Sequence, residues 1–250
     1  MEKNKVGAYN FVAEPFHVDF TGHLTMSVLG NHLLNCAGFH ANDRGFGMAS
    51  LNENHYTWVL SRLAIELEEM PYQYEDFTIE TWVENVYRLF TDRNFAVINK
   101  DGKYIGYARS IWAMIDMATR KPADLLTLHS GSIVDYVLSD KECPIEKSGR
   151  IKASTTTPFA EYQTKYSDID INGHVNSIKY IEHMLDLFPI EMFRDRKIKR
   201  FEIAYVAESY YGDTLSFYKE DVDENEYHIE VKKNGEEVVC RSKVVFNQGI

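Results

Sequence analysis

The sequence predicts an α+β fold made of two copies of one domain, each an antiparallel sheet wrapped around a long central helix. The same order of elements occurs twice, as an extended segment, a long apolar-periodic helix and then four strands. Each copy carries a hairpin signal, Asp101-Gly102 in the first and Asn234-Gly235 in the second. The run Asp19-Phe20-Thr21-Gly22-His23 also matches Asp170-Ile171-Asn172-Gly173-His174. An ordered series of matches indicates a duplication.

In the first copy, residues 8–20 are expected to be extended, and a long buried helix follows Thr21-Gly22-His23-Leu24. Its apolar positions recur at helical spacing, namely Val28, Leu29, Leu33, Cys36 and Ala37. Asn42-Asp43-Arg44-Gly45 is the expected exit. Four strands are expected at residues 58–67, 77–83, 88–98 and 104–116, with Asp101-Gly102 as the hairpin turn between the last two.

In the second copy, residues 159–166 are expected to be extended. The helix that follows shows apolar positions at Ile178, Ile181, Met184 or Leu185, and Phe188, and Asn172 and Gly173 stand where it is expected to begin. Strands are expected at residues 201–206, 214–222, 227–233 and 237–247. The polar segment 139–158 reads as an exposed linker, which divides the chain into domains 1–138 and 159–250.

Composition narrows the class of protein. The chain has 250 residues, of which 44% are hydrophobic, yet no apolar run is long enough for a membrane span. The N-terminus has no signal-peptide pattern, and three scattered cysteines suggest no disulfide framework, so a cytoplasmic location is expected. A net charge of −11 disfavours nucleic-acid binding, because contacts to phosphates need a surplus of Lys and Arg.

The polar cluster Asp168–Asn176 is the strongest candidate for chemistry. If a helix begins at Asn172, the cluster lies at its positive end, where free backbone amides can stabilise an oxyanion. The alternative is a plain capping loop with an incidental histidine.

The differences between the copies are informative. Thr21 stands where the second copy has Asn172, and aligning the strands from Arg62 and Arg200 places Met70 opposite Glu208. Asn172 and Glu208 therefore occur only in the second copy, which suggests that this copy carries the chemistry. Ordinary sequence drift is the alternative explanation. A carboxylate and an imidazole suit general-base hydrolysis of an acyl compound.

Other chemistries find less support. The sequence has no GxSxG elbow, P-loop or GxGxxG motif, and no cysteine lies near the cluster in sequence. Asp170, His174 and Glu208 could ligate an ion, but no recognised ligand spacing occurs. We therefore expect neither a metal nor a cofactor.

The run Ser167–Ile181 closely resembles the active-site segment of plant and bacterial acyl-acyl-carrier-protein (acyl-ACP) thioesterases. The first half agrees as well, through Trp58–Arg62, Thr81–Val83 and Thr119–Pro122. The resemblance covers nearly the whole chain in order. It implies a tandem hotdog fold and hydrolysis of the thioester that links a fatty acyl chain to the ACP phosphopantetheine. Plant members begin with a plastid transit peptide that this sequence lacks, which implies a bacterial-type cytoplasmic enzyme.

By this resemblance, the catalytic residues are Asp170, Asn172, His174 and Glu208. Plant members have Cys after the glutamate, whereas this chain has Ser209, so a mechanism based on that cysteine cannot operate unchanged. We expect Glu208 to activate water, with Asp170 and His174 orienting the network. The side chain of Asn172 and backbone amides near Gly173 would hold the thioester carbonyl.

The resemblance also suggests that the acyl chain enters the first copy, with Leu29, Leu33 and Leu34 as candidate lining residues. ACP is acidic, so docking needs a basic patch, and the densest basic run offers Arg194, Arg196, Lys197, Lys199 and Arg200. An acyl-CoA thioesterase and a non-catalytic protein that binds acyl chains or ACP are the alternatives. A homodimer, acyl-chain length and the role of Ser209 stay open.

Overall fold

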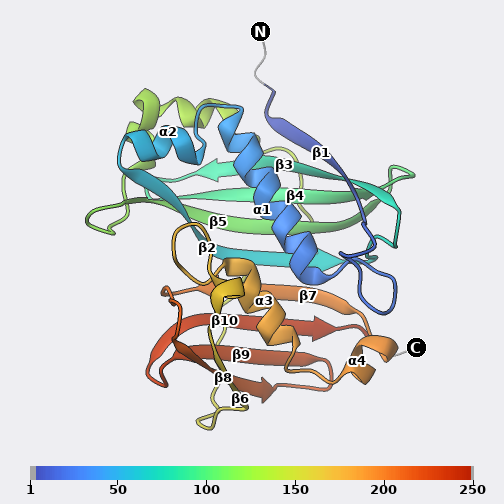
Figure 1. Ribbon diagram of the computed structural model, residues 1–250. Helices are drawn as coiled ribbons and strands as arrows, with labels where there is room; N and C mark the ends of the chain where they lie inside the picture. Colours follow the sequence, from blue (N-terminus) through green and yellow to red (C-terminus); the bar gives the residue numbers. More distant parts are fainter. Residues whose placement is uncertain (1–3, 249–250) are drawn as a thin grey trace. The chain divides into compact units, whose positions relative to one another are not determined.

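The computed structural model describes residues 4–248, which form two compact units (Figure 1). Within the described residues, unit 1 contains residues 4–25 and 29–147, and unit 2 contains residues 26–28 and 148–248. No helix in the described part of the chain is long and apolar enough to cross a membrane.

Unit 1 is an antiparallel sheet with one long helix on its face (Figure 1). Its strands are β1 (Val6–Val12), β2 (Tyr56–Leu67), β3 (Asp76–Val86), β4 (Phe90–Asn99) and β5 (Tyr104–Asp116), and its helices are α1 (Met26–Asn42), the short α2 (Met48–Glu53) and the irregular 3₁₀ segment η1 (Leu125–Tyr136). The spatial order of the strands is β1-β3-β4-β5-β2. The four predicted strands and the exit of the long helix are confirmed, whereas α2 and η1 were not anticipated.

Unit 2 repeats this arrangement. Its strands are β6 (Ala160–Gln163), β7 (Ile198–Tyr205), β8 (Thr214–Asp221), β9 (Glu226–Lys233) and β10 (Glu237–Phe246), and its helices are η2 (Tyr166–Asp168), α3 (Ser177–Leu185) and α4 (Ile190–Asp195). The spatial order β6-β8-β9-β10-β7 matches that of unit 1 when strands are ranked by sequence. The predicted α+β fold of two hotdog domains is confirmed.

Each central helix is held by one apolar stripe. Leu29, Leu33 and Cys36 of α1 are fully buried, at the spacing of one helix face. In α3, Ile181 and Met184 are fully buried in the same way. The stripe continues beyond α3 through Phe188, which is buried among aromatic rings of unit 2 although the helix has ended.

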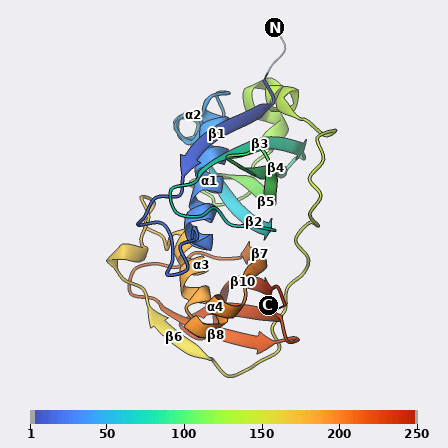
Figure 2. The same ribbon diagram turned by 90° about the vertical axis from the view of Figure 1, so that its right-hand side faces the viewer.

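The segment 139–158, expected to be an exposed linker, lacks helices and strands (Figure 2). It is only partly exposed. Cys143, Ile145 and Ile151 are buried. The guanidinium of Arg109 donates hydrogen bonds to the carbonyls of Cys143 at 2.5 Å and Ile145 at 2.8 Å. These bonds hold the first part of the segment against unit 1.

Candidate active site

The loop before α3 is folded around the carboxylate of Asp170. Its Oδ1 accepts hydrogen bonds from the backbone amides of Asn172 at 2.8 Å and His174 at 3.2 Å. The backbone of Asp170 adds two more bonds, accepting from the amide of Gly173 at 3.0 Å and donating to the carbonyl of His174 at 2.8 Å. Gly173 has φ +80°, a left-handed conformation that favours glycine. Asp170 therefore fixes the backbone that carries Asn172 and His174.

The expected start of the helix at Asn172 is wrong. Helix α3 begins at Ser177, and its N-cap is Asn176, whose side chain accepts a hydrogen bond from the amide of Ile178 at 2.9 Å. The amides of Asn172, Gly173 and His174 already bond Asp170, so they are not the free helix-terminal donors that the sequence suggested for an oxyanion.

His174 meets Glu208, which is 34 residues away in the sequence. Nε2 of His174 lies 3.5 Å from Oε2 of Glu208, and the hydroxyl of Tyr210 lies 3.4 Å from the same oxygen. The amide of Val175 donates to the carbonyl of Ser209 at 2.8 Å, and an antiparallel bridge joins His174 to Tyr210. The backbone thus holds the loop beside the chain that carries the glutamate.

The accessibility of these side chains suits a reaction with a substrate. The side chains of His174 and Glu208 are 24% and 34% exposed. Asn172 is exposed, and its side-chain amide has no hydrogen-bond partner among residues 4–248. Ser209, in contrast, is fully buried. The structure thus brings His174 and Glu208 together, bonds Asp170 to the backbone of the loop and leaves the side chain of Asn172 exposed.

A buried network supports the loop, and sequence reasoning missed it. The carboxylate of Asp168 accepts hydrogen bonds from the hydroxyl of Tyr162 at 2.9 Å, the amide of Lys165 at 2.7 Å and Nε2 of His183 at 2.9 Å. Burial opposes ionisation of Asp168, but these bonds together hold its pKa below the usual value. The carbonyl of Asp168 accepts the amide of Asn176, which closes the loop at its base.

The structure of unit 1 supports the alignment that pairs Met70 with Glu208. The amide of Leu24 donates to the carbonyl of Pro71 at 2.9 Å, which is the counterpart of the bond that Val175 donates in unit 2. Met70 immediately precedes Pro71, and Glu208 immediately precedes Ser209, which carries the corresponding carbonyl in unit 2. The carboxylate is therefore specific to unit 2.

Tyr210 is the residue of the site that the sequence analysis overlooked. The bridge between His23 and Tyr72 in unit 1 corresponds to the one between His174 and Tyr210, and each pair of rings packs edge to face. The repeat therefore contained a signal for it, because both copies have tyrosine at the same position after the strand. No group of three or more His, Cys, Asp or Glu in the described chain is arranged to hold a metal ion.

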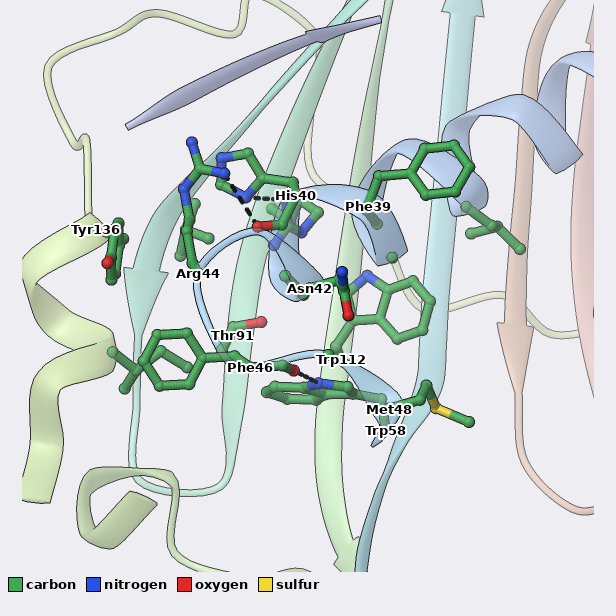
Figure 3. A pocket seen from close by; sticks show the side chains of 18 of the residues that line it. Phe39, His40, Asn42, Arg44, Phe46, Met48, Trp58, Thr91, Trp112 and Tyr136 are labelled. Carbon is green, nitrogen blue, oxygen red and sulfur yellow. Dashed lines mark hydrogen bonds between the residues drawn. The ribbon is translucent and has the colours of Figure 1, made fainter. Parts of the chain in front are cut away.

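Unit 1 contains a cavity of about 390 Å³ beside the second half of α1 (Figure 3). Its walls are mostly apolar and include Phe39, Phe46, Trp58, Trp112, Ile133 and Tyr136. Of the three residues expected to line an acyl pocket, Leu34 lines this cavity, whereas Leu29 and Leu33 are fully buried core residues outside its lining.

Comparison with known families gives a consistent result for both halves of the chain. Residues 6–127 match the acyl-ACP thioesterase N-terminal domain, and residues 151–249 match the acyl-ACP thioesterase C-terminal domain.

Curated relatives include the chloroplastic palmitoyl-acyl carrier protein thioesterase of Gossypium hirsutum, which is 24% identical over 214 residues, covering 81% of this chain and 52% of that protein. The chloroplastic oleoyl-acyl carrier protein thioesterase of Coriandrum sativum is 25% identical over 237 residues, covering 86% of this chain and 63% of that protein. The chain thus spans less than two thirds of the length of these relatives.

Among solved structures, an acyl-ACP thioesterase from Bacteroides thetaiotaomicron is 72% identical, with a TM-score of 0.94, and the match covers 99% of this chain and 100% of that one. The 12:0-ACP thioesterase from Umbellularia californica is 19% identical with a TM-score of 0.84, covering 98% of each chain, and this likeness shows the fold alone.

Proposed function

Because the chain belongs to the acyl-ACP thioesterase family, we propose that it hydrolyses the thioester of a fatty acyl-ACP to a free fatty acid and ACP. The observation that carries the proposal is the contact between the carboxylate of Glu208 and the imidazole of His174 at 3.5 Å. Both groups are partly exposed, and the carboxylate has no counterpart in the first copy, where Met70 stands at the corresponding position. A protein that only bound acyl chains would not need this pair.

In the proposed mechanism, Glu208 takes a proton from a water molecule, whose oxygen then attacks the thioester carbonyl carbon. The side-chain amide of Asn172, exposed and without a protein partner, donates to the oxyanion that develops. The C–S bond then breaks, and the proton passes through Glu208 and His174 to the leaving sulfur. The products are the carboxylic acid and the thiol.

Asp170 acts through the backbone in this scheme. Its bonds to the amides of Asn172 and His174 set the positions of both side chains. The backbone amides near Gly173, which the sequence suggested as oxyanion donors, have no part in the mechanism because Asp170 occupies them.

The acyl chain is proposed to occupy the cavity of unit 1. A concave site lined mainly by aromatic and aliphatic side chains suits a hydrocarbon. The chain-length preference of the enzyme then depends on the residues that close this cavity.

ACP is proposed to dock on the basic run that ends at β7, but not on every residue of it. Arg200 is buried, and its Nε lies 2.7 Å from Oε1 of Glu202, so it is not available to a partner. Arg196 is half-buried and bonds the carbonyl of Glu224. The side chains at the other three predicted positions, Arg194, Lys197 and Lys199, are exposed. The double substitution Lys197→Glu/Lys199→Glu is expected to raise KM for acyl-ACP but not for a small acyl thioester, and equal effects on both would refute docking there.

The reaction is tested with an acyl-ACP chain-length panel and matched acyl-CoA thioesters. Glu208→Gln is expected to lower kcat roughly 100- to 10,000-fold, because an amide cannot take the proton from water. Glu69→Gln, an exposed position next to Met70 in unit 1, is the matched control and should retain activity. Near-normal turnover by Glu208→Gln would refute the assignment. Faster hydrolysis of acyl-CoA than of acyl-ACP would favour the acyl-CoA thioesterase, and no turnover by the wild type would favour the binding protein.

The cytoplasm is the proposed location, supported by three free, buried cysteines, which fit a reducing compartment. A homodimer stays a prediction that analytical ultracentrifugation tests.

A further inference from the structure

The cavity of unit 1 contains a buried cation that its apolar lining does not explain. Arg93, on β4, lines the cavity and is only 8% exposed. Its hydrogen-bond partners are Oγ1 of Thr81 and Nδ1 of His40, both 3.1 Å from Nη1. Among residues 4–248, no carboxylate forms an ion pair with Arg93, and its Nε and Nη2 have no acceptor. Three of the five N–H groups of this guanidinium are therefore unused by the protein.

His40 does not compensate this charge. It is 1% exposed, in the last turn of α1, and its Nε2 lies 3.2 Å from the carbonyl of Lys5. Nε2 therefore carries the proton that this carbonyl accepts, and Nδ1 accepts from Arg93. Burial, together with the charges of Arg93 and Arg44, lowers the pKa of His40 to about 3, so the ring is neutral.

A second guanidinium adds to the positive charge. Arg44 donates to the carbonyl of His40 at 3.0 Å and to that of Asn4 at 2.5 Å, and it lies over the ring of Tyr136 (Figure 3). These partners are neutral, although the C-terminal end of α1 contributes a partial negative charge. Burial and the neighbouring Arg44 lower the pKa of Arg93 to about 10, which still leaves it protonated at neutral pH.

The acidic side chain next to Arg44 in the chain does not balance the pair. Asp43 is exposed, and its Oδ2 accepts the hydroxyl of Tyr9 at 3.1 Å. A buried charge without a counter-ion is costly, and proteins usually pair or neutralise such groups. The missing partner of Arg93 is therefore most simply supplied by a ligand.

We propose that this cavity binds an apolar chain that carries a carboxylate, with the carboxylate paired to Arg93 and the hydrocarbon against the aromatic walls. Guanidinium and carboxylate match in geometry, and two unused nitrogens can donate in parallel. Two sources share this chemistry: an acyl chain with a distal carboxyl group as substrate, or a free fatty acid. The inference rests on the proposed function in that the cavity is taken to receive acyl chains.

Binding tests the shared chemistry without any hydrolysis. Dodecanoate and 1-dodecanol, each below its micellar concentration, are compared by displacement of a fluorescent apolar probe from the full-length protein. The wild type should bind dodecanoate roughly tenfold or more tightly than dodecanol, as expected for a hydrogen bond to a charged group. Arg93→Met should remove this preference by weakening dodecanoate and not dodecanol.

The matched control is Arg88→Met, at an exposed arginine of the same unit that pairs with Asp124 and does not line the cavity. It should keep the preference. If Arg93→Met does not fold, Arg93→Lys should still reduce the preference, because an ammonium cannot bond a carboxylate in the same forked geometry. Equal binding of acid and alcohol by the wild type, or an equal loss in Arg88→Met, would overturn the proposal.

Hydrolysis then distinguishes the two sources. Faster cleavage of the ACP monothioester of dodecanedioate than of dodecanoyl-ACP, lost in Arg93→Met, identifies the substrate. Competitive inhibition of dodecanoyl-ACP cleavage by dodecanoate, relieved in Arg93→Met, identifies the free acid. Absence of both effects counts against the proposal. If the wild type hydrolyses no acyl-ACP, the proposed function fails while the binding comparison still decides this inference.

Discussion

The loops 19–24 and 170–175 have nearly the same backbone but different side-chain chemistry. In both, the aspartate amide donates to the histidine carbonyl at 2.8 Å and the glycine amide donates to the aspartate carbonyl at 3.0 Å. Gly22 and Gly173 share φ +80°. The residue after each histidine donates its amide to a carbonyl just after a strand, from Leu24 to Pro71 at 2.9 Å and from Val175 to Ser209 at 2.8 Å. The scaffold is therefore independent of the chemistry that it carries.

The side chains make the difference. In unit 1, the hydroxyl of Thr21 lies 2.6 Å from Asp19 Oδ1 and 3.0 Å from Nδ1 of His23, so the threonine links both residues within the loop. In unit 2, Asn172 makes no such link, and the imidazole of His174 faces the carboxylate of Glu208. Two positions, one in the loop and one after the strand, thus separate a structural loop from a candidate active site.

The residues beneath the two loops differ in the same direction. The ring of Phe11 packs at a tilt against His32 with centroids 4.3 Å apart, and that of Tyr162 packs at a tilt against His183 with centroids 4.1 Å apart. In unit 2 the tyrosine hydroxyl and the histidine both bond the buried Asp168. In unit 1 that place in the loop is taken by a histidine rather than a carboxylate. The loop with the candidate catalytic residues therefore has the stronger polar anchor.

Replacing the histidine of each loop gives the largest expected contrast. His174→Ala should lower kcat/KM roughly 100-fold or more, because it removes the group that contacts Glu208 and that relays the proton in the proposed mechanism. His23→Ala is the matched control, and it should change kcat/KM only a few-fold, since Met70 offers no carboxylate. Steady-state hydrolysis of acyl-ACP measures both, with thermal unfolding to confirm the fold. Similar losses in the two variants would contradict the division of roles.

The second-largest expected contrast is in stability, between Asp168 in unit 2 and His17 at the corresponding position in unit 1. Asp168→Asn should lower the free energy of unfolding at neutral pH by about 2–4 kcal/mol. The amide nitrogen of asparagine would face a hydrogen-bond donor at a place where an oxygen of the buried carboxylate accepts a hydrogen bond. The loop should loosen as well, lowering kcat/KM about tenfold. Denaturant unfolding and acyl-ACP hydrolysis measure the two effects.

The pH dependence gives this prediction a second measurement. The pKa of Asp168 is lowered in the folded state, so its ionisation stabilises the fold above the unfolded-state pKa of about 3.9. That contribution is lost as the pH falls through the folded-state pKa. The difference between wild type and Asp168→Asn should therefore shrink below about pH 4. His17→Asn, the corresponding change in unit 1, should cost less at every pH, and a pH-independent difference for Asp168→Asn would contradict the account.

The sequence was sufficient for the repeat because its signals are local. Hairpin dipeptides and alternating strands do not depend on distant residues, and Asp101-Gly102 and Asn234-Gly235 both lie in turns between the predicted strands. The start of α3 was not predicted, because Asn172 and Asn176 are equally good caps by type. The choice is decided by Asp170, whose carboxylate accepts hydrogen bonds from the backbone amides of Asn172 and His174 and so keeps them out of a helix. This competition is visible only in the folded loop.

The anchor at Asp168 was missed for a related reason. Tyr162 and His183 lie on different elements, 6 and 15 residues from Asp168, and no local spacing connects them. The pairing of Arg200 with Glu202, however, was within reach, since residues two apart in a strand share one face. Counting charges in a run overlooks this alternation, which is why the predicted docking residues included Arg200 although its side chain is buried.

Removing the tyrosine hydroxyl beside each histidine tests the same difference between the two units, with a smaller expected effect on kcat/KM. Tyr210→Phe should lower kcat/KM about two- to fivefold, because the hydroxyl lies 3.4 Å from Glu208 Oε2, a long hydrogen bond of modest strength. Tyr72→Phe should leave kcat/KM unchanged, since its ring packing on His23 is retained and no carboxylate stands at Met70. Equal effects in both units would indicate a role in packing rather than in orienting Glu208.

The smallest expected effect is at the position after the glutamate. Ser209 is fully buried, and its carbonyl accepts the amide of Val175, which is the same backbone role that Pro71 performs in unit 1 without a hydroxyl. Ser209→Ala should therefore keep kcat/KM within about twofold, well below the effect of losing a hydrogen bond to a charged group. A loss as deep as that of Glu208→Gln, measured on the same acyl-ACP, would instead make Ser209 the nucleophile. It would also require the hydroxyl to become accessible during turnover.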